Sequence, residues 1–193
     1  MEDENFQKNR IEIFKYNALL SIIFFLLSSI YFGQKIENYS FSQYTISAMS
    51  KFLDEKNLSY FNITFFIKSF LDLGFAYYVF KYFKIKFFSI TGFFWILAVL
   101  SFGLLGFFPS SQYQFIHIFI VGILLASWIV SEYLLAKLTN DEKFIYLTNN
   151  LLVIQIVSIF LFVFTNNFNG VIEIFYMAMI FFWLTNFIRN YLK

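Results

Sequence analysis

The sequence of 193 residues contains no cysteine, one proline and one histidine, and only 13% of its residues are charged. Without cysteine the chain can form no disulfide and can offer no thiolate to a metal or an iron–sulfur cluster. One histidine cannot supply both axial ligands of a haem, and histidine and carboxylates do not cluster with metal-ligand spacing. A net charge of +2 gives no support for nucleic-acid binding. We therefore predict no metal, no cofactor and no nucleic-acid partner.

Motifs that carry enzymatic chemistry are also missing. The chain has no G-x-S-x-G nucleophile elbow, no Walker loop, no dinucleotide fingerprint and no H-E-x-x-H helix. Its loops are too short to hold a soluble catalytic or nucleotide-binding domain. The sequence identifies no catalytic residue and favours a non-catalytic role, although it leaves enzymatic activity open.

Apolar residues dominate what remains, because 60% of the chain is hydrophobic and 25% is aromatic, with 32 Phe. The apolar runs are continuous, which favours membrane-crossing helices over the short alternating strands of a barrel. We predict an all-α, multi-pass membrane protein in which residues 1–193 form one six-transmembrane-helix bundle, with each span near the ~20 residues that cross a hydrocarbon core. The predicted spans are 14–33, 61–82, 87–108, 114–136, 148–166 and 170–190.

Breaks between the spans have recognisable chemistry. Pro109 is expected to close the third span, because proline cannot donate the backbone hydrogen bond of a continuing helix. The run from Asn166 to Gly170 predicts a tight turn, with Gly170 free to adopt a left-handed conformation. The first apolar segment follows a long, partly acidic leader without a small-residue cleavage site, so we expect a retained span rather than a signal peptide.

The distribution of basic residues predicts the orientation. Lys and Arg in short loops tend to stay in the cytoplasm. The two termini and the two loops on their side carry 10 basic residues, whereas the opposite loops carry 3, namely Lys35, Lys51 and Lys56. We predict a protein of a prokaryotic plasma membrane with both termini in the cytoplasm.

One long external connection, from about Gln34 to Tyr60, separates the first two spans. Within it, Ile46, Met49 and Phe52 recur at helical spacing, with charged residues on the opposite side. This pattern predicts a short amphipathic helix within the stretch from Tyr44 to Phe61 that lies on the outer surface. Its role stays open between a cap packed over the bundle and an element that binds a partner or gates lipid.

Lys68 and Asp72 are the most informative residues, because they lie four apart inside the second predicted span. Charge in a membrane segment is costly and is usually paired or functional. At ~1.5 Å per residue, Lys68 is expected roughly 10 Å below the outer end of that span and Asp72 roughly 16 Å below it. His117 and Glu173 lie within a turn of the outer starts of the fourth and sixth predicted spans, on the same side of the membrane. These four residues are predicted to line one polar pocket that opens toward the outer leaflet.

A purely structural interpretation of the pair carries equal weight. Lys68 and Asp72 share a helix face and can pair locally, although acid before base is the better order for an i, i+4 pair. Glu132 lies near the inner end of its span, where we expect Lys137 to neutralise it. Gln155 is expected to form an interhelical hydrogen bond. Gly103 and Gly106 are expected to let their helix approach a neighbour closely.

Several short motifs also occur in a characteristic order: Tyr44-x-x-Ser47, Phe61-Asn62, the stretch from Phe102-Gly103 to Phe108-Pro109, and His117. In their order and spacing the sequence resembles an uncharacterised family of bacterial and archaeal six-span membrane proteins, distantly similar to the FRAG/DRAM/Sfk group. The resemblance covers roughly residues 14–190. It implies a six-helix bundle with cytoplasmic termini, an outer polar cluster containing Ser47, Asn62 and His117, and a role in lipid organisation. The chain departs from the family where Lys51 to Asp54 replaces a common Leu-Gly pair.

These observations predict a membrane protein whose outer-leaflet pocket binds lipid headgroups or a small polar ligand. In this hypothesis Lys68 contacts phosphate, Asp72 holds and neutralises Lys68, and His117 and Asn62 supply hydrogen bonds. Membrane lipids are the expected partners. One alternative is a noncatalytic accessory or assembly subunit that contacts other membrane-protein subunits. Another is a small transporter or proton-coupled carrier that uses Asp72 and Glu132.

Overall fold

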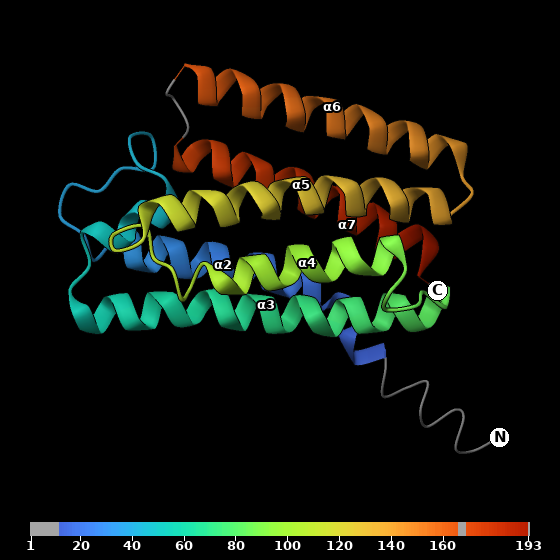
Figure 1. The fold of residues 1–193 in the computed structure, drawn as a ribbon, viewed down its shortest axis with the longest axis horizontal. Coiled ribbons are helices and arrows are strands. Elements are labelled where there is room, and N and C mark those ends of the chain that lie inside the picture. The colour runs from blue at the N-terminus through green and yellow to red at the C-terminus, as the bar shows by residue number, and fades with distance from the viewer. Residues whose placement is uncertain (1–11, 166–168, 193) are drawn as a thin grey trace.

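The computed structural model describes residues 12–165 and 169–192, which form six α-helices and two 3-10 helices without a strand in these ranges. The predicted all-α bundle is therefore confirmed. Figure 1 shows the helices running side by side along the long axis of the molecule. Their bounds are η1 Ile13–Tyr16, α2 Asn17–Gly33, η2 Ile46–Lys51, α3 Glu55–Phe83, α4 Ile90–Leu104, α5 Gln114–Leu138, α6 Glu142–Phe164 and α7 Gly170–Tyr191.

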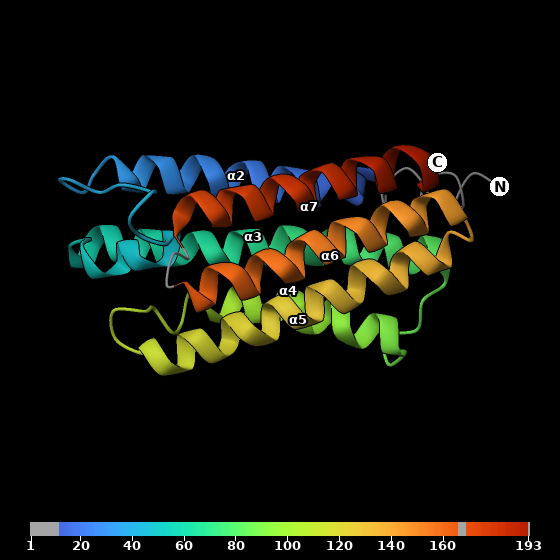
Figure 2. The same ribbon diagram turned by 90° about the horizontal axis from the view of Figure 1, so that it is seen from above.

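Helices that follow one another in the chain pack as antiparallel neighbours from α2 to α6, and α7 returns to pack against α2. The six α-helices thus surround a common interior (Figures 1 and 2). The pair α6 and α7 makes the least extensive contact in this ring. We call the end that holds η2 the cap end, and the end that holds Glu12 and Leu192 the terminal end.

Five of the helical segments are long and apolar enough to cross a membrane, which identifies the chain as a membrane protein. The exception is α4, which has 15 residues where a span over 87–108 was predicted. Its length is about 22 Å, shorter than a hydrocarbon core of ~30 Å. Pro109 was expected to end this helix, but α4 ends at Leu104 and a series of turns leads to the proline.

Two helices begin earlier than predicted because an aspartate caps each of them. The carboxylate of Asp54 accepts a hydrogen bond from the backbone N–H of Asn57, so α3 begins at Glu55 rather than near 61. Asp141 accepts from the backbone of Lys143 and Phe144, so α6 begins at Glu142 rather than near 148. Hydrogen bonds from Asn57 lower the pKa of Asp54. The hydroxyl of Tyr191 is the main cause of the lowered pKa of Asp141.

The connection between α2 and α3 is a cap, and the short helix expected within it is the 3-10 helix η2. Residues 46–51 form only the 3-10 helix η2, and the chain then enters α3 directly. Ile46 and Met49 are buried against the bundle, which agrees with a packed cap, whereas Phe52 is exposed. Burial raises the pKa of the Tyr39 hydroxyl, which donates to the carbonyl of Thr45 and helps to hold this loop.

Backbone hydrogen bonds join the cap to α7. The N–H groups of Gly170 and Val171 donate to the carbonyls of Tyr44 and Phe41. The expectation of a left-handed Gly170 is wrong, because no glycine in the described ranges has a positive φ. The small size of Gly170 matters instead, since an added Cβ would lie 2.9 Å from the carbonyl oxygen of Tyr44. The rest of the predicted turn, 166–168, lies outside the described residues.

Glycines also permit the close packing of α3 against the end of α4. A Cβ at Gly103 would lie 2.9 Å from the Ser69 hydroxyl, and one at Gly106 would lie 2.7 Å from the Asn62 carbonyl oxygen. The predicted close approach is confirmed. Gly122 in α5 differs, because a Cβ there would meet nothing within 4 Å.

We predict opposite effects of alanine at two of these positions. Gly106→Ala should lower the free energy of unfolding by ~1–3 kcal/mol, because the Asn62 carbonyl is backbone and cannot move aside cheaply. Gly122→Ala should be neutral or raise it by up to ~1 kcal/mol, because alanine favours the helix. Thermal melts of both variants in one detergent would measure this. Equal melting temperatures would contradict the close approach at Gly106.

Candidate ligand-binding cavity

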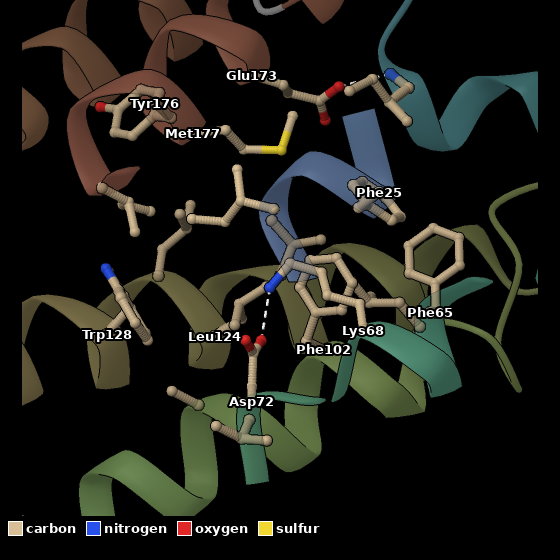
Figure 3. A pocket seen from close by; sticks show the side chains of 18 of the residues that line it. Phe25, Phe65, Lys68, Asp72, Phe102, Leu124, Trp128, Glu173, Tyr176 and Met177 are labelled. Carbon is tan, nitrogen blue, oxygen red and sulfur yellow. Dashed lines mark hydrogen bonds and ion pairs between the residues drawn. The ribbon is translucent and has the colours of Figure 1, made fainter. Parts of the chain in front are cut away.

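A cavity of about 160 Å³ lies inside the bundle, and all six α-helices and η2 contribute to its wall. Most of the wall is aliphatic or aromatic, as Figure 3 shows for Phe25, Phe65, Phe102, Leu124 and Met177. Besides Trp128 and Tyr176, the lining residues with polar side chains are Ser47, Lys68, Asp72, His117, Gln155 and Glu173. Five of the six residues predicted to form the site therefore line one cavity.

Lys68 and Asp72 form an ion pair in this wall, with 2.6 Å between Nζ and Oδ2. The side chains of the two residues are only 11% and 10% exposed. Lys68 lies at the middle of α3, because the helix begins at Glu55. It is therefore roughly 20 Å from the cap end of α3, deeper than the sequence suggested.

Groups from two other helices hold the pair in place. The hydroxyl of Ser21 in α2 donates to Oδ1 of Asp72 at 2.5 Å. Nζ of Lys68 lies 4.2 Å from the centre of the Phe102 ring in α4, within the range of a cation–π contact. The local pairing foreseen from the sequence is confirmed, and the pair also faces the cavity (Figure 3).

Glu173 and His117 are anchored at the cap end of the cavity. The carboxylate of Glu173 accepts a hydrogen bond from the backbone N–H of Ile46 at 2.5 Å, which ties α7 to η2. Nδ1 of His117 is 2.8 Å from the carbonyl oxygen of Phe108, so this nitrogen carries the proton and donates it. Nε2 of His117 is buried without a hydrogen-bond partner within the described ranges.

Asn62 does not line the cavity, which corrects its predicted place in the site. It begins the third turn of α3, and its backbone carbonyl faces the turn after α4 at Gly106. Ser47 does line the cavity, and its carbonyl accepts hydrogen bonds from the hydroxyls of Ser50 and Ser110. Within the described part of the chain, no three histidine or carboxylate side chains gather as metal ligands.

A polar network that sequence analysis only partly foresaw lies on the side of the cavity nearer the terminal end. Glu132 is 1% exposed and accepts hydrogen bonds from Nε1 of Trp128 at 3.0 Å and Nε2 of Gln155 at 3.2 Å. The hydroxyl of Tyr176 donates to the backbone carbonyl of Gln155. The interhelical bond of Gln155 is thus confirmed. Lys137 does not pair with Glu132, because its Nζ lies 4.7 Å above the ring of Tyr133.

The missed members of this network, Trp128 and Tyr176, resemble the many other aromatic residues of the chain. No spacing signal distinguishes them, because their role depends on which side of each helix faces the interior. Comparison with known proteins finds no family model that matches the chain, and no curated protein or solved structure with significant similarity to it. The resemblance to the FRAG/DRAM/Sfk group stays a prediction.

We predict that the ion pair is strongly coupled. Lys68→Met or Asp72→Asn alone should lower the free energy of unfolding by ~3–5 kcal/mol, because each leaves one buried charge without its partner. The double replacement Lys68→Met/Asp72→Leu should recover most of this loss. Lys81→Met, at an exposed position of the same helix, is the matched control and should change little. Thermal melts in detergent measure all four variants, and additive losses would contradict the coupling.

Proposed function

We propose that the protein binds a lipid or another amphipathic ligand in its central cavity. One observation carries this proposal: a mostly apolar cavity within the bundle contains a buried ion pair whose lysine keeps donors to spare. An apolar wall suits a hydrocarbon chain, and a few placed polar groups orient a ligand. The same combination does not suit a fully polar solute.

The size of the cavity supports partial enclosure of the ligand. Its volume of about 160 Å³ is below the ~300–1,000 Å³ of pockets that enclose a whole drug-sized molecule. A complete two-chain phospholipid cannot fit inside. A short stretch of one acyl chain, or the polar group with its nearest carbons, can, while the rest of the ligand stays in the bilayer.

Lys68 is the proposed contact for the polar group. An ammonium has three N–H donors, and its hydrogen bond to Asp72 uses one of them. A phosphate or carboxylate oxygen can therefore accept from Lys68 while Asp72 keeps it in position. Asp72 balances the charge of Lys68, and Glu173 adds a carboxylate at the cap end, so one polar group suits the site better than a polyanion.

His117 and Ser47 complete the proposed site near the cap. Because Nδ1 of His117 donates to Phe108, its neutral ring offers a lone pair at Nε2 for a hydroxyl of the ligand. We place the cap end at the outer surface, because Lys81, Lys137 and Lys143 all lie toward the terminal end. The ligand would then enter from the outer leaflet.

Native mass spectrometry of protein extracted gently from bacterial membranes tests this proposal. We expect a retained phospholipid mass on the wild type and loss of most of it from Lys68→Met. Leu124→Trp should also lose it, because a larger side chain fills part of the cavity while Lys68 and Asp72 themselves stay unchanged. Lys81→Met is again the control and should retain lipid like the wild type.

Equal lipid retention by the wild type, Lys68→Met and Leu124→Trp would contradict the proposed site. A wild type that carries no lipid but copurifies with a second membrane protein in fixed ratio would instead support the accessory-subunit alternative. Melting temperatures of all variants show whether a loss of lipid reflects a loss of fold.

A further inference from the structure

From the way α5 and α6 diverge, we infer that the ligand is a membrane lipid whose acyl chain enters the cavity sideways, between the cap-end halves of these helices. This inference rests on the proposed function, and it goes further by naming the source and the route of the ligand. We call this opening the lateral portal, and its rim is formed by Val121, Leu125 and Ile159.

Several side-chain hydrogen bonds fasten α6 to its neighbours between its N-cap, Asp141, and its middle, at Gln155. Nε1 of Trp183 donates to Thr148 at 2.9 Å, the hydroxyl of Tyr191 donates to Asp141 at 2.7 Å, and Gln155 donates to Glu132. Tyr176 adds its bond to the Gln155 carbonyl. In a membrane such bonds and close packing decide where helices join, because lipid chains are as apolar as the side chains. The terminal end of α6 is therefore closed.

Beyond Gln155 the side chains on the inward side of α6 become progressively more exposed. Gln155 is 1% exposed, Ile159 one turn later is half-buried, and Val163 another turn later is 56% exposed. These residues follow one another at a spacing of four, so they lie on nearly the same side of the helix. The hydroxyls of Ser158 and Thr165 donate to carbonyls of α6 itself. Ile159 still packs against Ile172, Tyr176 and Met179 of α7, whereas Val163 beyond it is exposed.

The facing side of α5 shows the same gradient. Glu132 is 1% exposed, Leu125 and Val121 are half-buried, and Ile118 is 62% exposed. Next to them, a Cβ on Gly122 would meet nothing within 4 Å. The two helices thus form a V that is closed at Glu132 and Gln155 and open toward the cap end, which agrees with the outlying position of α6 in Figure 1.

The lateral portal leads into the cavity, because Val121, Leu125 and Ile159 line the cavity as well as the rim. All three side chains are aliphatic, so the rim of the passage suits the hydrocarbon chain of a lipid. In a bilayer the V would face lipid chains directly. At the cap, by contrast, Ile46 and Met49 are buried and the hydroxyls of Ser50 and Ser110 are 3.0 Å apart, which closes the axial route.

Because the chain has no cysteine, engineered cysteines would be its only thiols in a crosslinking test. Trp95→Phe and Trp183→Phe would leave Trp128, which lines the cavity, as the single fluorescent reporter. In this background, Leu125→Cys/Ile159→Cys can be bridged with a short bis-maleimide across the portal. Phosphatidylglycerol with brominated acyl chains is then added in detergent, and the rate at which bromine quenches Trp128 is recorded.

Bridging the portal should slow the quenching by about tenfold, as expected when a gate controls access. The matched control is Ser50→Cys/Ser110→Cys, whose disulfide closes the cap and should leave the rate unchanged. Leu125→Ala, which needs no crosslink, should widen the rim and accelerate quenching. A portal bridge without effect, or a cap disulfide that slows quenching, would overturn the lateral route while leaving lipid binding intact.

No quenching of Trp128 in the unbridged protein, together with no lipid mass by native mass spectrometry, would contradict the proposed function itself. Lipid mass without quenching would overturn only the entry of an acyl chain into this cavity. The unbridged form of each double variant, measured in the same preparation, separates the effect of the bridge from that of the substitutions.

Discussion

The buried ion pair between Lys68 and Asp72 is the constraint on which the rest of the structure depends. Two charges at the middle of the longest helix are costly in an apolar interior unless each is paired and hydrogen-bonded. Helical geometry brings them to 2.6 Å, but α2 must supply the Ser21 hydroxyl and α4 the Phe102 ring. The position and rotation of three helices are therefore tied to one charge pair, and the cavity lies on its open side.

The two ends of the bundle are held together by different means. At the terminal end, side-chain hydrogen bonds join α5, α6 and α7. At the cap end, the backbone of residues 41–46 receives hydrogen bonds from the start of α7 and donates one to Glu173. The cap-end half of α6 meets α7 through Ile159, which packs against Ile172, Tyr176 and Met179. A bundle built in this way is rigid around the ion pair and most easily opened beside α6.

Much of the fold could be predicted from the sequence, because long apolar runs and the i, i+4 spacing of Lys68 and Asp72 are local properties. The errors also have local causes. Charged first turns concealed the starts of α3 and α6, since residues 55–60 and 142–147 look like loops until their aspartate caps are recognised. The apolar spacing of Ile46 and Met49 fits a 3-10 helix as well as it fits an α-helix, so the sequence predicted a short helix in the cap but not its type.

The sequence by itself determined that this chain is an all-α membrane protein, placed Lys68 and Asp72 where they can pair on one helix face, and marked Gly103 and Gly106 as points of close helix approach. Only the tertiary structure decided which polar residues share a cavity. Asn62 turned out to lie away from it, Glu132 pairs with Trp128 and Gln155, and α6 diverges from α5. The reason is that these helices are apolar on all sides, so no polar stripe marks the inward side of each one. Rotation about the helix axis follows from packing between helices, which no single segment encodes.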